Sequence, residues 1–190
     1  MADSISNIFS PFLITAVTVL LLAFRSELEP ARALVWAFIV VAISVLPILV
    51  ALALLVRAGR LDSLFASIRK QRTEVYVIGI AFTAADYVIL RYTNAPAIFM
   101  AALGTALLGL AVFMCINFWW KISVHTAFAG AMVTVLIIFY GWWGLIVAPL
   151  VFFIGWARIA LKEHTLAQVA VGAVLASAIG LVGFNLFGYV

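Results

Sequence analysis

The sequence predicts an all-α protein, a polytopic transmembrane helix bundle of six to seven spans that forms one domain over residues 1–190. Of the 190 residues, 68% are hydrophobic and only 9% are charged, whereas a soluble domain carries roughly 25% charged residues. The apolar residues also form runs close to the length of about 20 residues that an α-helix needs to cross a bilayer. Composition and run length together favour lipid over water as the solvent around this fold.

Seven candidate spans follow in order at residues 8–24, 33–56, 75–92, 95–118, 126–142, 144–161 and 166–187. The first has no Lys or Arg ahead of its apolar run and no small-residue cleavage site after it, so we expect a span and not a signal peptide. Only GWWG separates the fifth span from the sixth. This spacing predicts a tight hairpin, with Trp142 and Trp143 at the membrane interface, where such rings are enriched.

The polar loops converge on one face of the predicted bundle. Alternation places the loops at 57–74, 117–125 and 158–165 together, because an even number of spans separates each loop from the next. This face carries eight of the eleven basic residues, namely Arg57, Arg60, Arg69, Lys70, Arg72, Lys121, Arg158 and Lys162. The positive-inside rule makes this face cytoplasmic. Apolar residues at helical spacing in the first loop predict a short interfacial helix near 60–70.

Charge and cysteine content restrict the partners. The net charge of +4 resides in short connections, where basic side chains meet membrane lipid headgroups or an anionic substrate, so we expect no nucleic-acid partner. Cys115 is the only cysteine, which excludes an intrachain disulfide and a metal site built on several thiolates. The sequence leaves the oligomeric state open.

Three segments on the polar face carry the candidate chemistry: RLDSLFASIRKQRTE at 60–74, KISVHTA at 121–127 and WARIALKEHTLAQ at 156–168. In order, they resemble the signature motifs of the type 2 phosphatidic acid phosphatase superfamily of integral membrane lipid phosphatases. Those motifs are a Lys-containing stretch ending in Arg-Pro, then Pro-Ser-Gly-His, then Ser-Arg, five residues, His, three residues and Asp. The resemblance covers a phosphatase-like core at about 57–190, and the two leading spans in residues 1–56 are unspecific.

The third motif matches at Arg158 and His164, which keep the five-residue gap, while Gln168 stands where the family has Asp. The second matches at Ser123 and His125, without the flanking Pro and Gly. In the first, Arg72 corresponds to the Arg of Arg-Pro and is followed by Thr instead of Pro. The nearest candidates for the other cation of that motif are Arg69 and Lys70.

The resemblance implies a phosphatase that needs no metal or other cofactor. His164 would attack phosphorus to give a phosphohistidine, and His125 would protonate the leaving oxygen. Arg72, Arg158 and a first-motif cation would hold the phosphoryl oxygens, because phosphoryl transfer depends mostly on positioning and charge stabilisation. Ser123 and Thr165 stand at expected helix starts, where free backbone N–H groups bind anions.

Several polar residues have a second interpretation. Gln168 forms a capping box with Thr165, which is an alternative to orienting the nucleophile. Lys121 suits either a second phosphate or lipid headgroups, and Asp62 is either an orienting acid for a loop arginine or a solvated loop acid. Asp86 falls inside the third span, where an acid is costly, so we expect it to face the bundle and pair with an arginine or serve a structural role.

Three hypotheses follow. The first is a membrane-embedded phosphatase acting on a lipid phosphate or diphosphate, with a slight preference for a polyprenyl diphosphate over phosphatidate-type lipids because of the additional lysine. The second is a lipid-phosphate-binding or transport protein without turnover, because Gln168 replaces the acid. The third treats the polar residues as topology signals and helix caps.

Overall fold

The structure is a computed structural model that describes residues 1–190, and it contains helices and no strands. The α-helices are α1 (Ala2–Ile8), α2 (Pro11–Ala23), α3 (Pro30–Arg57), α4 (Arg72–Tyr92), α5 (Ala97–Asn117), α6 (Val124–Tyr140), α7 (Pro149–Ala160) and α8 (Leu166–Leu186). Two 3-10 helices, η1 (Arg69–Gln71) and η2 (Gly141–Val147), precede α4 and α7. The all-α prediction is confirmed.

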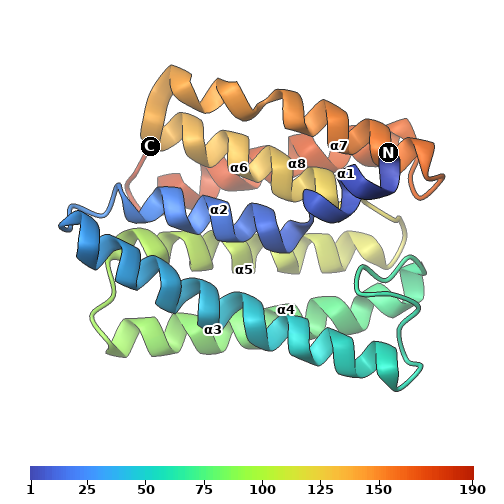
Figure 1. The fold of residues 1–190 in the computed structure, drawn as a ribbon, viewed down its shortest axis with the longest axis horizontal. Helices are drawn as coiled ribbons and strands as arrows, with labels where there is room; N and C mark the ends of the chain where they lie inside the picture. The colour runs from blue at the N-terminus through green and yellow to red at the C-terminus, as the bar shows by residue number, and fades with distance from the viewer.

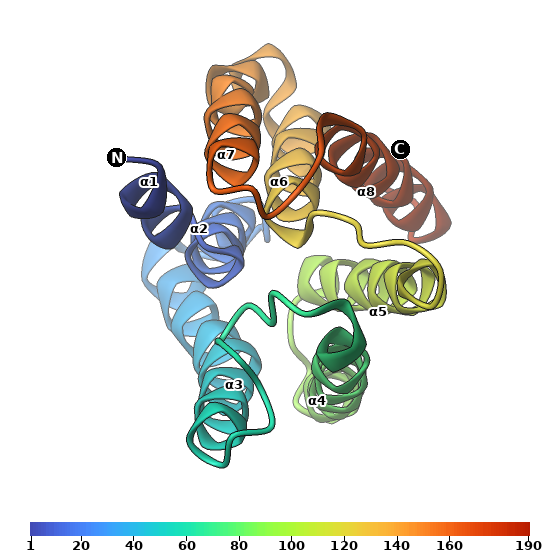
Figure 2. The ribbon, with the colours of Figure 1, turned by 90° about the vertical axis from the view of Figure 1, so that its right-hand side faces the viewer.

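The long helices run side by side in alternating directions and form a bundle (Figure 1). Five helical segments are long and apolar enough to cross a membrane, and the bent pair α1 and α2 makes a sixth candidate. The length and composition of these helices are those of a multi-pass integral membrane protein. The α3–α4, α5–α6 and α7–α8 loops all lie at one end, together with α1 (Figures 1 and 2). The predicted convergence of the polar loops is confirmed, and we call this end the polar end.

The first predicted span is broken where it was expected to be continuous. Ser10 caps the start of α2 by accepting a hydrogen bond from the backbone N–H of Leu13, and Pro11 occupies the first helical position. Proline fits there because its missing N–H would have no partner within the helix. The break turns α1 by 43° from α2. The short α1 thus packs beside α7 at the polar end.

The GWWG segment makes the predicted hairpin. Gly141 ends α6 with φ of 61°, a left-handed conformation that glycine adopts without steric cost. Gly144 then packs against the backbone of Ile137 so closely that a Cβ atom would clash. Trp142 and Trp143 are exposed at the tip. The sixth predicted span is therefore η2 followed by α7, which at 12 residues is too short to cross a bilayer alone.

The predicted interfacial helix near 60–70 is wrong. Residues 61–68 contain turns and bends, and only the three residues of η1 are helical in this stretch. Leu61 and Ala66 are buried against Leu52 of α3, so the loop folds inward instead of lying on the membrane. The Asp62 carboxylate accepts from the Ser67 backbone N–H at 3.0 and 3.1 Å. These contacts favour a compact loop over a helix with one apolar side.

Close packing between α6 and α8 brings two of the polar segments together. A Cβ atom on Gly172 would lie 2.7 Å from the Ser123 carbonyl oxygen, and one on Gly130 would lie 2.6 Å from the Ala173 carbonyl oxygen. Small residues allow membrane helices to approach in this way. The Ser123 N–H donates to the Gln168 carbonyl at 3.3 Å. The start of α6 and the first turn of α8 are thereby fixed to each other.

Asp86 lies on α4 and is buried, as expected for an acid inside a span. No ion pair joins it to an arginine, so that part of the prediction is wrong. One of its carboxylate oxygens has no hydrogen-bond partner.

Candidate active site at the polar end

His164 lies in the α7–α8 loop and is 6% exposed. Its Nε2 is 3.3 Å from Arg72 Nη2, and its Nδ1 is 2.9 Å from Gln168 Oε1. Because a guanidinium only donates, Nε2 must accept, and the ring proton must reside on Nδ1 and be donated to Gln168. The contacts therefore define one tautomer, with the lone pair of Nε2 directed toward Arg72.

Gln168 performs both functions that the sequence presented as alternatives. Its side-chain oxygen accepts from the Thr165 backbone N–H at 3.3 Å, and the Thr165 hydroxyl accepts from the Gln168 N–H at 3.3 Å. This is the predicted capping box. The same oxygen accepts the Nδ1 proton of His164. One neutral amide thus caps α8 and orients the imidazole.

Arg72 is the first residue of α4 and is 4% exposed. Its Nε donates to the Ala66 carbonyl at 2.9 Å and its Nη1 to the Ile122 carbonyl at 2.6 Å, while Nη2 contacts His164. Each of these three partners belongs to a different loop. Arg72 consequently joins all three polar segments and places a positive charge against the candidate nucleophile.

His125 lies in the first turn of α6 and is 3% exposed. Ser123 caps this helix, with its hydroxyl accepting from the Thr126 N–H at 3.5 Å. The His125 and Phe65 rings form a T-shaped contact, with ring centroids 4.7 Å apart. Its Nε2 has no hydrogen-bond partner. A buried polar atom without a partner is costly, so this nitrogen is suited to a group that arrives with a ligand.

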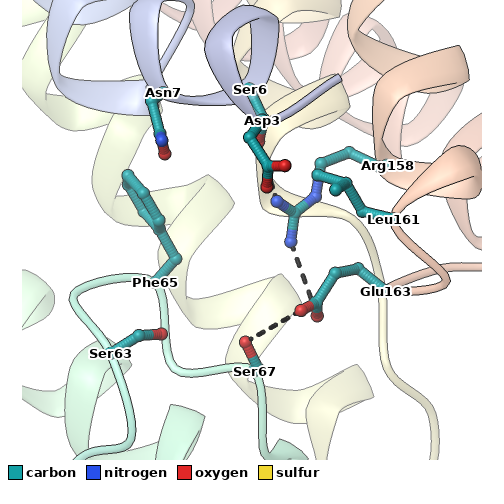
Figure 3. Close-up of a pocket in the computed structure, with 9 residues that line it drawn as sticks. All are labelled: Asp3, Ser6, Asn7, Ser63, Phe65, Ser67, Arg158, Leu161 and Glu163. Atoms are coloured by element: carbon teal, nitrogen blue, oxygen red, sulfur yellow. Dashed lines mark hydrogen bonds and ion pairs between the residues drawn. The ribbon is translucent and has the colours of Figure 1, made fainter. Parts of the chain in front are cut away.

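Arg158 lies near the end of α7 and is 5% exposed. Its Nη1 donates to the Ser6 hydroxyl of α1 at 2.8 Å, and its Nη2 lies 3.6 Å from Glu163 Oε2. It borders a largely polar cavity of about 410 Å³ (Figure 3). The other lining residues are Asp3, Ser6, Asn7, Ser63, Phe65, Ser67, Leu161 and Glu163.

Glu163 connects this cavity to Lys121. Lys121 Nζ donates to the Glu163 carbonyl oxygen at 2.9 Å and lies 3.4 Å from its carboxylate. The other carboxylate oxygen accepts from the Ser67 hydroxyl at 3.2 Å. The Glu163 carboxylate therefore contacts two cations and a serine from three segments.

The charges at the polar end alter two titrating groups outside the helices. Burial, reinforced mainly by the Arg72 charge, lowers the pKa of His164 to about 3, which keeps the imidazole neutral and nucleophilic at neutral pH. Burial and the Arg72 charge also lower the pKa of Lys121, while Glu163 opposes that shift.

Four predicted site residues are not placed to bind a phosphoryl group. Arg69 Nη1 donates to the Asn117 carbonyl at 2.7 Å and to the Phe118 carbonyl, so it caps the end of α5. Lys70 is exposed and makes no contact with the buried cluster. Asp62 orders its own loop through Ser67 and contacts no arginine. Ser123 is fully buried as the α6 cap. These contacts leave Arg72, Arg158 and Lys121 as the candidate phosphate-binding cations.

The contribution of α1, which supplies Asp3, Ser6 and Asn7 to the cavity, was not predicted from the motifs. The available signal was the alternation of spans, which places residues preceding the first span on the same face as the three polar loops. Ser67 was not predicted either, because no motif or spacing in the sequence marks this residue. No group of three or more His, Cys, Asp or Glu side chains is arranged to hold a metal ion.

The arrangement places an oriented imidazole lone pair, a second buried histidine and three cations around one end of an apolar bundle. Such a site can bind an anion and present a nitrogen nucleophile to it. Comparisons of this chain with protein-family models, with curated proteins and with solved structures gave no match.

Proposed function

We propose that the protein is an integral membrane phosphatase that hydrolyses a lipid phosphate or diphosphate through a phosphohistidine. The observation that carries this proposal is the state of His164. Gln168 holds its Nδ1 proton and Arg72 stands at its Nε2. A neutral, oriented imidazole next to a guanidinium is what attack on a phosphoryl group requires.

In the proposed reaction, the phosphoryl oxygens take over the N–H of Arg72, which frees the Nε2 lone pair of His164. Nε2 forms a bond to phosphorus while the bond from phosphorus to the lipid oxygen breaks. The substrate phosphate arrives with one proton, which the neutral His125 takes and passes to that oxygen. Water then attacks the phosphohistidine and gives its proton to His125. His125 passes this proton to the departing phosphate, and both histidines return to their starting states.

We place the polar end on the cytoplasmic side, where the positive-inside rule locates loops rich in Lys and Arg. The lipid phosphate would enter at the level of the headgroups, and its tail would remain among the apolar helices. A polyprenyl diphosphate is the preferred substrate, because Lys121 offers a cation beyond those near His164.

The experiment that tests the proposal measures phosphate release from lipid phosphates and diphosphates by the detergent-solubilised protein. His164→Ala should abolish release, and acid-labile, base-stable phosphate should be trapped on the wild-type chain but not on the variant. Lys70→Gln is the matched control, because Lys70 is an exposed cation outside the cluster. Unchanged release by His164→Ala refutes the mechanism.

One observation favours a second function, a lipid-phosphate-binding or transport protein without turnover. Gln168 offers a neutral oxygen where a carboxylate would stabilise the positive charge that develops on the ring during attack. On this alternative, the wild-type protein binds lipid phosphates and releases no phosphate. The same assay, run with a binding measurement on each lipid, distinguishes the two functions.

A further inference from the structure

The polar end holds two separate groups of anion-binding donors. One is Arg72 at His164. The other consists of Lys121, Arg158 and Ser67, which we call the second donor group. All three members of this group surround the Glu163 carboxylate, at 3.4, 3.6 and 3.2 Å respectively.

The members of the second donor group come from distant parts of the chain. Ser67 belongs to the α3–α4 loop, Lys121 to the α5–α6 loop and Arg158 to the end of α7. A carboxylate at their centre satisfies donors that would otherwise repel one another or lack partners. Phosphoryl groups and carboxylates are bound by the same donors, because both present anionic oxygens.

We infer that Glu163 occupies a second phosphoryl subsite, which receives the non-reacting phosphoryl group of a diphosphate when the carboxylate moves away. This inference rests on the proposed function. The two subsites are close to each other, as the two phosphoryl groups of a diphosphate are, because the Lys121 and Arg158 charges act on the His164 ring and the Arg72 charge acts on Lys121. A monophosphate at His164 would leave the second donor group with Glu163.

The cavity has room for the Glu163 side chain when it leaves the second donor group. Its side chain is 27% exposed and lines the 410 Å³ cavity, so the carboxylate can move into water when a ligand displaces it (Figure 3). Glu163 therefore acts as an internal competitor. It lowers the affinity for any anion that needs the second donor group, in proportion to the time that it occupies the subsite.

Two substitutions with opposite expected effects test the inference. Calorimetry on the detergent-solubilised protein would compare methylenediphosphonate, a diphosphate analogue that resists hydrolysis, with methylphosphonate. Glu163→Gln removes the competing charge and should tighten diphosphonate binding about tenfold, the equivalent of one hydrogen bond to a charged group. Lys121→Met removes a donor and should weaken diphosphonate binding about fivefold, the range of one partly exposed ion pair. Methylphosphonate binding should change little in either variant.

Glu74→Gln is the matched control, because Glu74 pairs with the exposed Arg60 outside the cluster. If Glu163→Gln and Lys121→Met both weaken diphosphonate binding, the pair is a structural contact and the inference is wrong. Equal affinities in wild type and both variants also overturn it. If either of these two results is found and phosphate release still depends on His164, the second subsite is refuted and the proposed function is retained. Absence of both release and binding in wild type refutes the proposed function as well.

Discussion

Replacing Gln168 by Glu places a negative charge beside the candidate nucleophile His164, where the protein has a neutral amide. The glutamate has the same length and shape, so its carboxylate can accept the Nδ1 proton of His164 as Gln168 Oε1 does at 2.9 Å. It also retains the cap on α8, because Glu and Gln both serve at the third position of a capping box. The change therefore adds a negative charge beside the ring without removing an existing contact.

The magnitude follows from the geometry. A unit charge about 4 Å from the ring contributes about 4 kcal/mol at an effective dielectric constant of about 20. Gln168 is half-buried, so water screens part of this interaction and about 2 kcal/mol remains, which is within the range for a hydrogen bond to a charged group. If that stabilisation applies to the transition state, Gln168→Glu raises the rate of phosphate release roughly 30-fold.

The same interaction raises the pKa of His164 from about 3. Stabilising the imidazolium by about 2 kcal/mol raises this pKa by between one and two units. The ring is still neutral at pH 7, so protonation does not cancel the gain in rate. Thr165→Ala is the control, because it removes the other half of the capping box without touching the ring. It should lower stability by about 1 kcal/mol and leave the release rate nearly unchanged. A folded Gln168→Glu protein with an unchanged or lower rate contradicts the proposed role of charge at this position.

Two further predictions concern the resting site and its scaffold. With only two histidines in the chain, ¹⁵N NMR should show His164 neutral at pH 5 with its proton on Nδ1, because burial and the Arg72 charge disfavour the cation until the pH approaches 3; a ring that is charged at pH 5 contradicts this. Gly172→Ala should destabilise the protein by about 1–3 kcal/mol in thermal unfolding, since its Cβ would lie 2.7 Å from the Ser123 carbonyl oxygen. Gly109→Ala, whose nearest contact would be at 3.8 Å, should be tolerated, and equal effects of the two substitutions would refute the packing argument.

Alternation of spans was the most informative part of the sequence. Each pass reverses direction, so counting passes is enough to assign the loops of Arg72, His125 and His164 to one end, and the structure has them there. The side on which a loop lies does not depend on exact helix ends. The break between α1 and α2 and the division of the sixth span into η2 and α7 were not predicted. Neither of them changes the end at which each loop lies.

The α3–α4 loop could not be predicted by the same argument. Leu61, Leu64, Phe65 and Ile68 have helical spacing, but spacing predicts a helix only if these residues share one apolar surface. In the structure Leu61 is buried, Ile68 is exposed, and Phe65 packs on His125. Long-range contacts with other segments therefore determine the loop conformation, and a local pattern contains no information about them.

Glu163 shows a second limit of local reasoning. The rule that adjacent residues on a helix do not face each other does not apply to Glu163 and His164, because both lie in the α7–α8 loop. The rule also gives no partner for the carboxylate, and the backbone of this loop includes Lys162 with φ of 57°. The turn directs Glu163 toward Lys121 and Ser67 while His164 faces Arg72 and Gln168. One short polar segment thus contributes to both donor groups, and separate substitutions of its two residues can test the nucleophile and the second subsite independently.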